Sequence, residues 1–396
     1  MKVLVLHNFY QRRGGEDVVV AAEHALMRDS GRYDVHVETV TNDAISGIGT
    51  QLKTFLNAPY DRSRAQWARE LLGRIKPDVV HIHNFFPLLT PAVHHAAAAT
   101  GVAVVQTLHN YRLICGGSSM LRNGTVCEKC VHGTRLWAVV HRCYRGSLPA
   151  SVAAVRMQYE AQARGTWRNS VHRFIALSQF GRRKFIEGGL PGESIVVKPN
   201  FAIAPKAGMS SAADRSGVLY VGRLSAEKGV NVLLAAASRL PDVHFKVAGD
   251  GPQRARLQAA APANVEFLDW LPHERIAELM REAACVAMPS MSYEGCPMVA
   301  VEAFANGAPV VASRLGALGE MVTPENGVHF EAGDAEGLAG AVGDLLNSPQ
   351  RIAELSAGAM RTHQALYTPE ANIRQIGEIY QAAIEEAASR RQARAV

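Results

Sequence analysis

The chain has 396 residues, of which 48% are hydrophobic and 20% are charged, and its net charge is +6. This length exceeds what one hydrophobic core normally organises, so we expect two domains of about 150 to 200 residues each. The first residues, MKVLVLHNFYQRRGGED, hold an apolar run too short for a secretory signal, and no later run reaches the roughly 18 residues of a membrane span. We therefore expect a cytoplasmic protein whose six cysteines are reduced.

Short runs rich in Val and Ile alternate with longer helical stretches along the chain. The first series of such runs covers residues 2–7, 78–84, 102–110 and 173–178. The second series covers residues 217–223, 244–250, 265–270, 285–290, 309–313 and 327–330. Continuous apolar strands of this kind are typical of parallel sheets that are covered by helices on both faces. The sequence therefore predicts an α/β protein with two doubly wound, Rossmann-like domains that face a central cleft.

The domain limits follow from composition. Residues 198–217 are rich in Pro, Ala, Ser and Gly without a sustained period, which indicates a linker. We place an N-terminal domain at residues 1–200 and a C-terminal domain at residues 201–370. Residues 371–396 are predicted to form a C-terminal helix, which could pack back on the N-terminal domain. Its last residues carry three arginines and little apolar content, so we expect them to be frayed.

Basic residues are concentrated between residues 135 and 184, where Glu160 is the one acid. The basic residues there are Arg135, Arg142, Arg145, Arg156, Arg164, Arg168, Arg173, Arg182, Arg183 and Lys184. An anionic partner such as a membrane surface or a phosphorylated substrate suits this segment. The alternative is a solvated helix face with ion pairs at four-residue spacing. Nucleic acid is not expected, because no known binding module matches and few aromatic residues interleave the arginines.

The stretch GRLSAEKG follows the strand predicted at residues 217–223. Ligands of open α/β sheets bind at the carboxyl ends of the strands, and Arg223 and Lys228 lie in such a loop. Two cations at this spacing could clamp a diphosphate. The alternative is that Lys228 forms a surface ion pair with Glu227, which would contribute little, or that it caps a neighbouring element.

The stretch EGCPMVAVE places Glu294 and Glu302 on either side of a helix start. Pro297 suits the first helical position, so the N–H groups of Gly295, Cys296 and Met298 would form an anion site beside Glu294. Glu302 would lie roughly 9 Å further along an apolar helix, where an unpaired carboxylate is costly. A nucleotide sugar would meet all of these groups. Alternatively, Glu294 favours the helix dipole and Glu302 is solvated.

These motifs carry a resemblance. EGCPMVAVE, GRLSAEKG, the AGDGP of residues 248–252, and VVAS followed by GALGE resemble the retaining GT-B glycosyltransferases of glycosyltransferase family 4, over residues 217–330. The resemblance implies that Glu294 binds the donor sugar of a UDP- or GDP-sugar, that Glu302 binds its ribose, and that Arg223 and Lys228 neutralise the departing diphosphate. It also implies that Gly251, Pro252 and the segment at Trp270 and Leu271 flank the base, and that catalysis requires neither a dedicated base nor a metal ion.

Two features of the N-terminal half belong to the same comparison. Gly14 and Gly15, in the loop NFYQRRGGED, allow close approach to a ligand, as a glycine loop does in the resembled family. The alternative is an ordinary turn, and the absence of G-x-G-x-x-G argues against a nicotinamide-dependent dehydrogenase. His109 follows the strand predicted at residues 102–110, and the resemblance implies that it faces the donor sugar. Alternatively, a backbone carbonyl satisfies its imidazole.

Four cysteines lie close together in an insert near residues 112–147. They are Cys115, Cys127, Cys130 and Cys143, with the spacing C-x11-C-x2-C-x12-C. This spacing could provide a structural zinc site, although common zinc modules have two C-x2-C pairs. Reduced thiols, or a disulfide or a redox role, are the alternatives. The insert resembles that of family members encoded for bacterial surface polysaccharide synthesis, and its position after His109 suggests that it shapes the acceptor side.

The sequence predicts a retaining glycosyltransferase that moves a sugar from a nucleoside diphosphate sugar to an acceptor hydroxyl. A polyprenyl-diphosphate-linked glycan at the inner face of the cell membrane is the expected acceptor, because a basic N-terminal domain would suit an anionic surface. Two alternatives stay open. One is another GT-B enzyme such as a nucleotide-sugar epimerase, and the other is a non-catalytic subunit that binds a nucleotide sugar.

Overall fold

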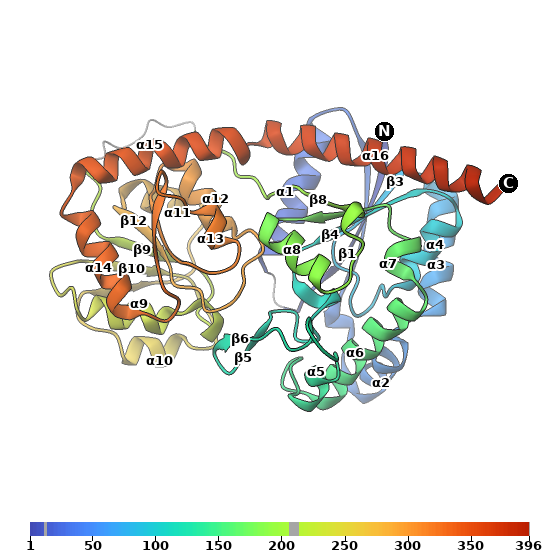
Figure 1. Cartoon of the computed structure of the whole chain (residues 1–396), viewed down its shortest axis with the longest axis horizontal. Coiled ribbons are helices and arrows are strands. Elements are labelled where there is room, and N and C mark those ends of the chain that lie inside the picture. The colour runs from blue at the N-terminus through green and yellow to red at the C-terminus, as the bar shows by residue number, and fades with distance from the viewer. Residues whose placement is uncertain (12–13, 206–213, 396) are drawn as a thin grey trace. The chain divides into compact units, whose positions relative to one another are not determined.

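A computed structural model describes residues 1–11, 14–205 and 214–395, so part of the predicted linker and two residues of the NFYQRRGGED loop lie outside the described chain. The chain divides into two compact units (Figure 1). Unit 1 consists of Met1–Met120, Cys127–Lys198 and Ile373–Val396, and unit 2 consists of Leu121–Val126 and Pro199–Asn372. Each unit is built on a six-stranded sheet whose strands all pair in parallel.

The sheet of unit 1 has the order β2-β1-β3-β4-β7-β8. Its strands are β1 (Lys2–Phe9), β2 (Asp34–Thr41), β3 (Val79–Ile82), β4 (Ala103–Leu108), β7 (Arg173–Ala176) and β8 (Ile195–Val197). The four strands that the sequence predicted here are confirmed as β1, β3, β4 and β7. The direction of chain progression reverses between β1 and β3, and ligands bind at such a switch point in open α/β sheets.

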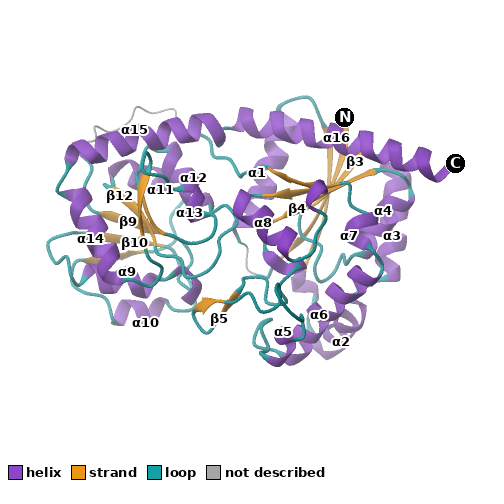
Figure 2. Cartoon of the chain, in the orientation of Figure 1, coloured by secondary structure: helices purple, strands orange, loops and turns teal. Residues whose placement is uncertain are grey.

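Helices cover both sheets, as Figure 2 shows. The helices of unit 1 are α1 (Gly15–Asp29), α2 (Gly47–Asn57), α3 (Arg62–Ile75), α4 (Ala92–Ala99), α5 (Trp137–Val140), α6 (Leu148–Ala163), α7 (Thr166–Asn169) and α8 (Gln179–Glu187). Polar side chains start several of them: Asp61 caps α3, Ser147 caps α6 and Ser178 caps α8. No helix in the described part of the chain is long and apolar enough to cross a membrane.

The C-terminal helix α16 (Pro369–Ala395) contributes to the core of unit 1. Ile376 and Tyr380 of α16 pack with Val20 and Met27 of α1 against the apolar side chains of the sheet. The Tyr380 hydroxyl also hydrogen-bonds Nδ1 of buried His81 at 2.7 Å. Helix α16 is therefore held to unit 1 by apolar packing and by a buried hydrogen bond.

The helix corrects the expectation of a frayed C-terminus, because it continues to Ala395. Residues with high helix propensity fill its last turns. Side chains one turn apart support it there, since Gln381 donates to Glu385 at 3.0 Å and Arg390 forms an ion pair with Glu386. Ala387 is buried in the core of unit 1, which holds this part of the helix in place.

The sheet of unit 2 has the order β11-β10-β9-β12-β13-β14. Its strands are β9 (Val218–Val221), β10 (Phe245–Ala248), β11 (Val265–Leu268), β12 (Cys285–Met288), β13 (Val310–Ser313) and β14 (Gly327–Phe330), each of which the sequence predicted. This is the dinucleotide-binding order, in which the third strand lies at one edge and the first and fourth strands meet in the middle. The switch point therefore falls between β9 and β12.

The helices of unit 2 are α9 (Val230–Ala237), α10 (Arg254–Ala259), α11 (His273–Glu282), α12 (Met298–Ala305), α13 (Leu318–Met321), α14 (Ala335–Leu346) and α15 (Pro349–Leu366). One core cluster of unit 2 joins alternate side chains of the sheet, such as Tyr220 and Val247, to α9 and α14. The predicted helical region after Asp334 is confirmed, and Asp334 itself caps α14. A two-stranded hairpin, β5 (Leu121–Arg122) and β6 (Thr125–Val126), lies within the cysteine-containing segment.

Candidate functional site

Two of the predicted catalytic residues meet at the switch point of unit 2. Lys228 ends the short 3-10 helix Ala226–Lys228 that follows β9, and Glu294 lies in the loop between β12 and α12. The Lys228 ammonium is 2.7 Å from Oε1 of Glu294, and the Ser290 hydroxyl donates to the same oxygen at 2.8 Å. The alternative pairing of Lys228 with Glu227 is wrong, because the Lys228 ammonium contacts Glu294. Glu227 instead accepts a hydrogen bond from the Ser225 hydroxyl.

Gly229 allows the loop after β9 to pack closely against the loop between β12 and α12. Gly229 has φ +68°, and a Cβ at this position would lie 1.8 Å from the carbonyl oxygen of Pro289. The Met291 N–H donates to the Glu227 carbonyl at 2.8 Å across the same contact. Because only glycine combines a positive φ with this close approach, Gly229 fixes the position of Lys228 relative to Glu294.

Arg223 and Gly251 lie next to this pair. Arg223 is exposed, and its guanidinium forms no ion pair with any residue that the structure describes. Gly251 packs directly on the loop of Arg223, since a Cβ there would approach the Leu224 carbonyl oxygen to 2.4 Å. Pro252 follows and is exposed. The AGDGP and GRLSAEKG motifs therefore form one surface at the ends of β9 and β10.

The start of α12 differs by one position from the prediction. Pro297 is the N-cap rather than the first helical residue, because its ψ of 125° is extended and its carbonyl accepts from the Ala300 N–H at 3.1 Å. The unpaired N–H groups that a helix start offers are then those of Met298 and the residues after it. Cys296 is buried just before the cap, where its carbonyl accepts from the Asn200 amide at 2.8 Å.

Glu302 lies on α12 with a side chain only 14% exposed, so the solvated alternative is wrong. Its Oε1 atom is 3.8 Å from Nδ1 of His273, the first residue of α11. Burial raises the pKa of the Glu302 carboxyl, and the nearby His273 lowers it. Trp270 and Leu271, which precede α11, are exposed and half-buried respectively. Apart from His273, this carboxylate forms no ion pair with the described residues and is available to accept hydrogen bonds from hydroxyl groups.

In unit 1, His109 is held by a second histidine and not by a backbone carbonyl. Nε2 of His109 lies 2.9 Å from Nδ1 of His83, and the two rings are stacked at 5.2 Å. Burial, together with the neighbouring His7, His81 and Lys198, lowers the pKa of His109 to about 3. Burial also lowers the pKa of His83. Both imidazoles are therefore neutral near pH 7. A neutral imidazole has one donor and one acceptor nitrogen, so it can both donate a hydrogen bond to a hydroxyl group and accept one from it.

Gly14 and Gly15 begin helix α1 in a region that leaves space around them. Gly14 is the N-cap with an ordinary φ of −123°, and a Cβ on either glycine would meet no atom within 4 Å. The Gly14 N–H donates to Asp17 at 2.8 Å, and the same carboxylate contacts Nε2 of His7 at 2.7 Å. Neither turn geometry nor packing among the described residues therefore requires these glycines.

Sequence reasoning missed a buried polar group beside these glycines. The Asn110 amide donates to the Tyr10 hydroxyl and to Oε2 of Glu16, both at 3.2 Å. Burial raises the pKa of Glu16 to about 7. The signal was present, because Tyr10 and Glu16 belong to the glycine loop and Asn110 directly follows His109.

Arg112 extends the same group. Its guanidinium is buried between the rings of Phe86 and Tyr144, with its central carbon 4.7 Å and 4.6 Å from the two ring centres. Its Nε and Nη1 atoms have no hydrogen-bond partner within the described chain. A buried cation with two unused donors adds positive charge next to Glu16.

The predicted zinc ligands are near one another without forming a closed site. Cys115 is buried and the other three cysteines are half-buried. Burial, together with the thiols of Cys115 and Cys143, raises the pKa of Cys130 to about 11. A tetrahedral zinc–thiolate centre would bring the sulfur atoms to about 3.8 Å. Across the described residues, no cysteine belongs to a group of three ligand atoms within 4.8 Å of one another, so zinc stays a prediction.

Another cluster with metal-ligand chemistry already contains an internal cation. Glu23, His81 and His83 lie within 4.8 Å of one another in the core of unit 1. The Lys198 ammonium contacts Glu23 at 2.6 Å, and both nitrogens of His81 are bonded, to the Tyr380 and Thr107 hydroxyls. Because an internal cation already supplies the positive charge, this cluster is a structural hydrogen-bond network.

Comparisons with known proteins agree with this geometry. The family model for Glycosyltransferase Family 4 matches residues 3–202, and that for Glycosyl transferases group 1 matches residues 215–348. The glycogen synthase of Mycobacterium tuberculosis is 37% identical over 142 residues, which is 33% of this chain and 34% of that protein. This chain therefore spans about a third of the length of that relative.

Solved structures share the fold at low sequence identity. Sucrose-phosphate synthase from Thermosynechococcus elongatus is 20% identical, with a TM-score of 0.69 over 96% of this chain and 98% of its own. Anabaena HepE in complex with UDP-glucose is 19% identical, with a TM-score of 0.63 over 98% of this chain and all of its own. Two parallel-sheet α/β units in this arrangement of strands are the GT-B fold. The chain belongs to glycosyltransferase family 4.

Proposed function

We propose that the protein is a retaining glycosyltransferase that moves a sugar from a UDP- or GDP-sugar to an acceptor hydroxyl. The observation that carries this proposal is the contact of Lys228 with Glu294 at the switch point of unit 2, beside the start of α12. A cation, a carboxylate and a helix N-terminus together match a ligand that contains both a diphosphate and hydroxyl groups. The solved relative HepE, which was crystallised with UDP-glucose, supports this ligand class.

Donor binding would exchange the partners of this ion pair. The diphosphate would take Lys228 from Glu294, with Arg223 and the N–H groups at Met298 as further donors. Glu294, still held by Ser290, would then accept hydrogen bonds from the hydroxyls of the transferred sugar. Glu302 would accept from the ribose hydroxyls, while Gly251, Pro252 and Leu271 would line the base. The bound donor would thus replace the contact between Lys228 and Glu294 with several contacts between the protein and the nucleotide sugar.

Transfer with retention follows from front-side attack. The bond between the anomeric carbon and the diphosphate oxygen breaks as the acceptor oxygen bonds to the same face. The acceptor proton passes to the departing diphosphate, so no side chain is required as a base. Arg223, Lys228 and the start of α12 would stabilise the developing negative charge in place of a metal ion. His109, whose imidazole is neutral, would hydrogen-bond a substrate hydroxyl.

We assign a polyprenyl-diphosphate-linked glycan of bacterial polysaccharide synthesis as the acceptor and the inner face of the cell membrane as its location. The basic segment of unit 1 supports this choice only in part. Arg164, Arg173 and Lys184 are in ion pairs with acids, as the solvated-face alternative expects. Arg142 and Arg156, in contrast, are exposed and form no ion pair with the described residues. These arginines could meet an anionic surface.

Product analysis tests the reaction. The purified protein, a nucleotide sugar and a polyprenyl-diphosphate-linked acceptor should give one nucleoside diphosphate per sugar transferred, and the anomeric coupling constant of the product should match that of the donor. Conversion of the donor sugar without acceptor would indicate an epimerase. A protein that binds the donor and produces neither outcome with any acceptor would be a binding subunit, which contradicts the proposal.

A further inference from the structure

Helix α2 presents an unusual surface. None of its residues is buried, although it is amphipathic. Ile48, Leu52 and Leu56 follow one another at four-residue spacing, so they lie along one side of the helix. Each of them is more than half exposed, and Ile48 reaches 86%. An apolar stripe that faces solvent has a function outside the packing of its own unit.

The stripe belongs to a larger surface. Helices α2 and α5 both contact α6, and Figure 2 shows the three together. Leu136, Val140 and Leu148, at α5 and at the start of α6, are also exposed. We call this surface the apolar face and define it by its exposed apolar residues: Ile48, Leu52, Leu56, Leu136, Trp137, Val140 and Leu148. Arg156 of α6 joins its parts by stacking over Phe55 of α2, 5.5 Å from the ring centre.

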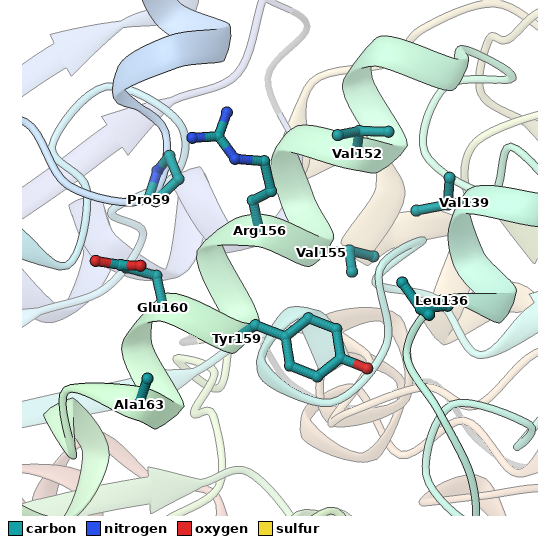
Figure 3. Close-up of a pocket in the computed structure, with 9 residues that line it drawn as sticks. All are labelled: Pro59, Leu136, Val139, Val152, Val155, Arg156, Tyr159, Glu160 and Ala163. Atoms are coloured by element: carbon teal, nitrogen blue, oxygen red, sulfur yellow. The ribbon is translucent and has the colours of Figure 1, made fainter.

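A groove of about 430 Å³ opens beside this face. Figure 3 shows Leu136, which precedes α5, and Val139 of α5 opposite Val155 and Tyr159 of α6, whereas Arg156 and Glu160 extend on the other side of the helix. The side chains between α5 and α6 are apolar, and one of them, Leu136, also belongs to the apolar face. The groove therefore continues the apolar face inward and could receive a hydrocarbon chain.

Basic residues outnumber acids around the apolar face, although Asp43 and Asp61 flank the α2 region. Residues 44–60 and 135–159, which include α2, α5 and most of α6, contain no Asp or Glu. They contain five basic residues: Lys53, Arg135, Arg142, Arg145 and Arg156. Glu160, the acid that lines the groove, is neutralised by Arg164 at 2.7 Å. A partner that is apolar inside and anionic outside complements such a surface.

A second copy of the chain does not fit this requirement. In a two-fold dimer the same patch meets itself, so the basic residues of one copy would face those of the other. A phospholipid bilayer with anionic headgroups provides hydrocarbon for the leucines and negative charge for the arginines at the same depth.

We infer that the apolar face is a docking surface for an anionic phospholipid membrane, with α2 lying in the plane of the headgroups. The inference relies on the proposed function in one respect, because docking would place the chain at the membrane that carries the proposed lipid-linked acceptor. Membrane binding itself needs no substrate and can be measured without any transfer reaction.

Vesicle flotation tests the inference. The full chain is mixed with vesicles of phosphatidylglycerol and phosphatidylcholine, or of phosphatidylcholine alone, at low salt. The double variant Leu52→Glu/Val140→Glu replaces two exposed apolar residues of the face by acids. Leu366→Glu is the matched control, since Leu366 is a leucine of similar exposure at the end of α15. Thermal unfolding and circular dichroism verify that all variants are folded.

The wild type and Leu366→Glu should float with the anionic vesicles, and the double variant should bind with a partition coefficient lower by about tenfold or more. A wild type that stays unbound, or a double variant that binds like the control, would overturn the inference. A concentration-dependent dimer that the double variant abolishes would also overturn it and would assign the face to a second copy. Because donor binding is measured separately, failure of docking leaves the proposed reaction intact.

Discussion

The two units carry candidate residues at the carboxyl ends of strands, at or next to a switch point, and the candidate groups of the two units differ in charge. Unit 2 presents full charges, with Lys228 paired to Glu294 and Arg223 exposed. In unit 1 the imidazoles of His83 and His109 are neutral, because burial lowers their pKa values.

The cause of the difference is the surroundings and not the residue types alone. A group stays charged where an opposite charge or water is near, and it becomes neutral where it is buried without one. Lys228 and Glu294 stabilise each other at a partly open position, whereas the imidazoles of unit 1 are buried near another cation, Lys198. The charged region of unit 2 suits a diphosphate, and the neutral region of unit 1 suits hydroxyl groups.

The strongest way to break this contrast is to remove Lys198. Its ammonium and the Glu23 carboxylate are both almost fully buried and 2.6 Å apart. Lys198→Met would leave the carboxylate unpaired, and we expect the free energy of unfolding to fall by about 3–5 kcal/mol. Urea unfolding at pH 7 measures this loss. The exposed Lys2 provides the control, because Lys2→Met should change stability by less than about 1 kcal/mol. Equal losses in the two variants would contradict a buried ion pair.

The second prediction removes the charge of unit 2. Lys228→Met should lower kcat by about 10²–10³-fold, the usual cost of losing one group that stabilises transition-state charge. Lys246→Met is a matched control, because the Lys246 side chain is similarly exposed. Its ammonium lies 3.8 Å from the Glu282 carboxylate, at a place that is not the switch point. Initial rates of nucleoside diphosphate release compare the two variants. A normal rate in Lys228→Met would show that the charge in unit 2 is not catalytic.

The third prediction uses Glu16 to test the neutral state of unit 1. Its pKa is raised from 4.5 to about 7, so the unfolded chain loses this proton at lower pH than the folded chain. Glu16 therefore contributes to the free energy of unfolding below about pH 4.5. This contribution falls by at most about 3 kcal/mol as the pH rises from 4.5 to 7. Glu16→Gln removes this titration.

The stability of Glu16→Gln relative to wild type should therefore increase between pH 4.5 and 7 and stay constant above. Chemical unfolding across this range gives the difference. Glu70→Gln, at an exposed position of α3, should run parallel to wild type. A constant difference for Glu16→Gln would mean that the carboxyl is ionised throughout.

The smallest expected effect concerns the cysteines. If Cys115, Cys127, Cys130 and Cys143 bind structural zinc, metal analysis of the purified protein should give about one equivalent. Cys127→Ser should reduce this content, whereas Cys285→Ser, in the core of unit 2, should not. Less than about a tenth of an equivalent in wild type would contradict the zinc prediction.

Sequence patterns predicted the fold where strands are buried on both faces. The run VVHI of β3 is buried throughout, so its composition alone identifies a central strand. The edge strand β2 was missed, because DVHVETVT alternates polar and apolar residues and is partly exposed. The three residues of β8 were too short to stand out. The C-terminal helix extends further than composition indicated, because contacts distant in sequence, such as that of Tyr380 with His81, hold it.

The candidate site shows the same limit. Spacing indicated Lys228 and Glu294 separately, and their direct contact depends on loops held by Gly229 and Pro289, which local sequence does not reveal. The pairing of His83 with His109 joins two strands that are neighbours only in the folded sheet. Arg112 was not found, since a buried arginine between aromatic rings has no local signature.

Nucleotide-sugar binding at unit 2 tests the central claim most directly. Thermal unfolding with a panel of UDP- and GDP-sugars should reveal one donor that adds about 2.7 kcal/mol of stability at 100 times its dissociation constant. Glu302→Ala should weaken that donor, whereas Glu278→Ala, on the exposed side of α11, should bind it like wild type. The account is contradicted if no nucleotide sugar stabilises the protein, or if Glu302→Ala binds the donor as tightly as Glu278→Ala.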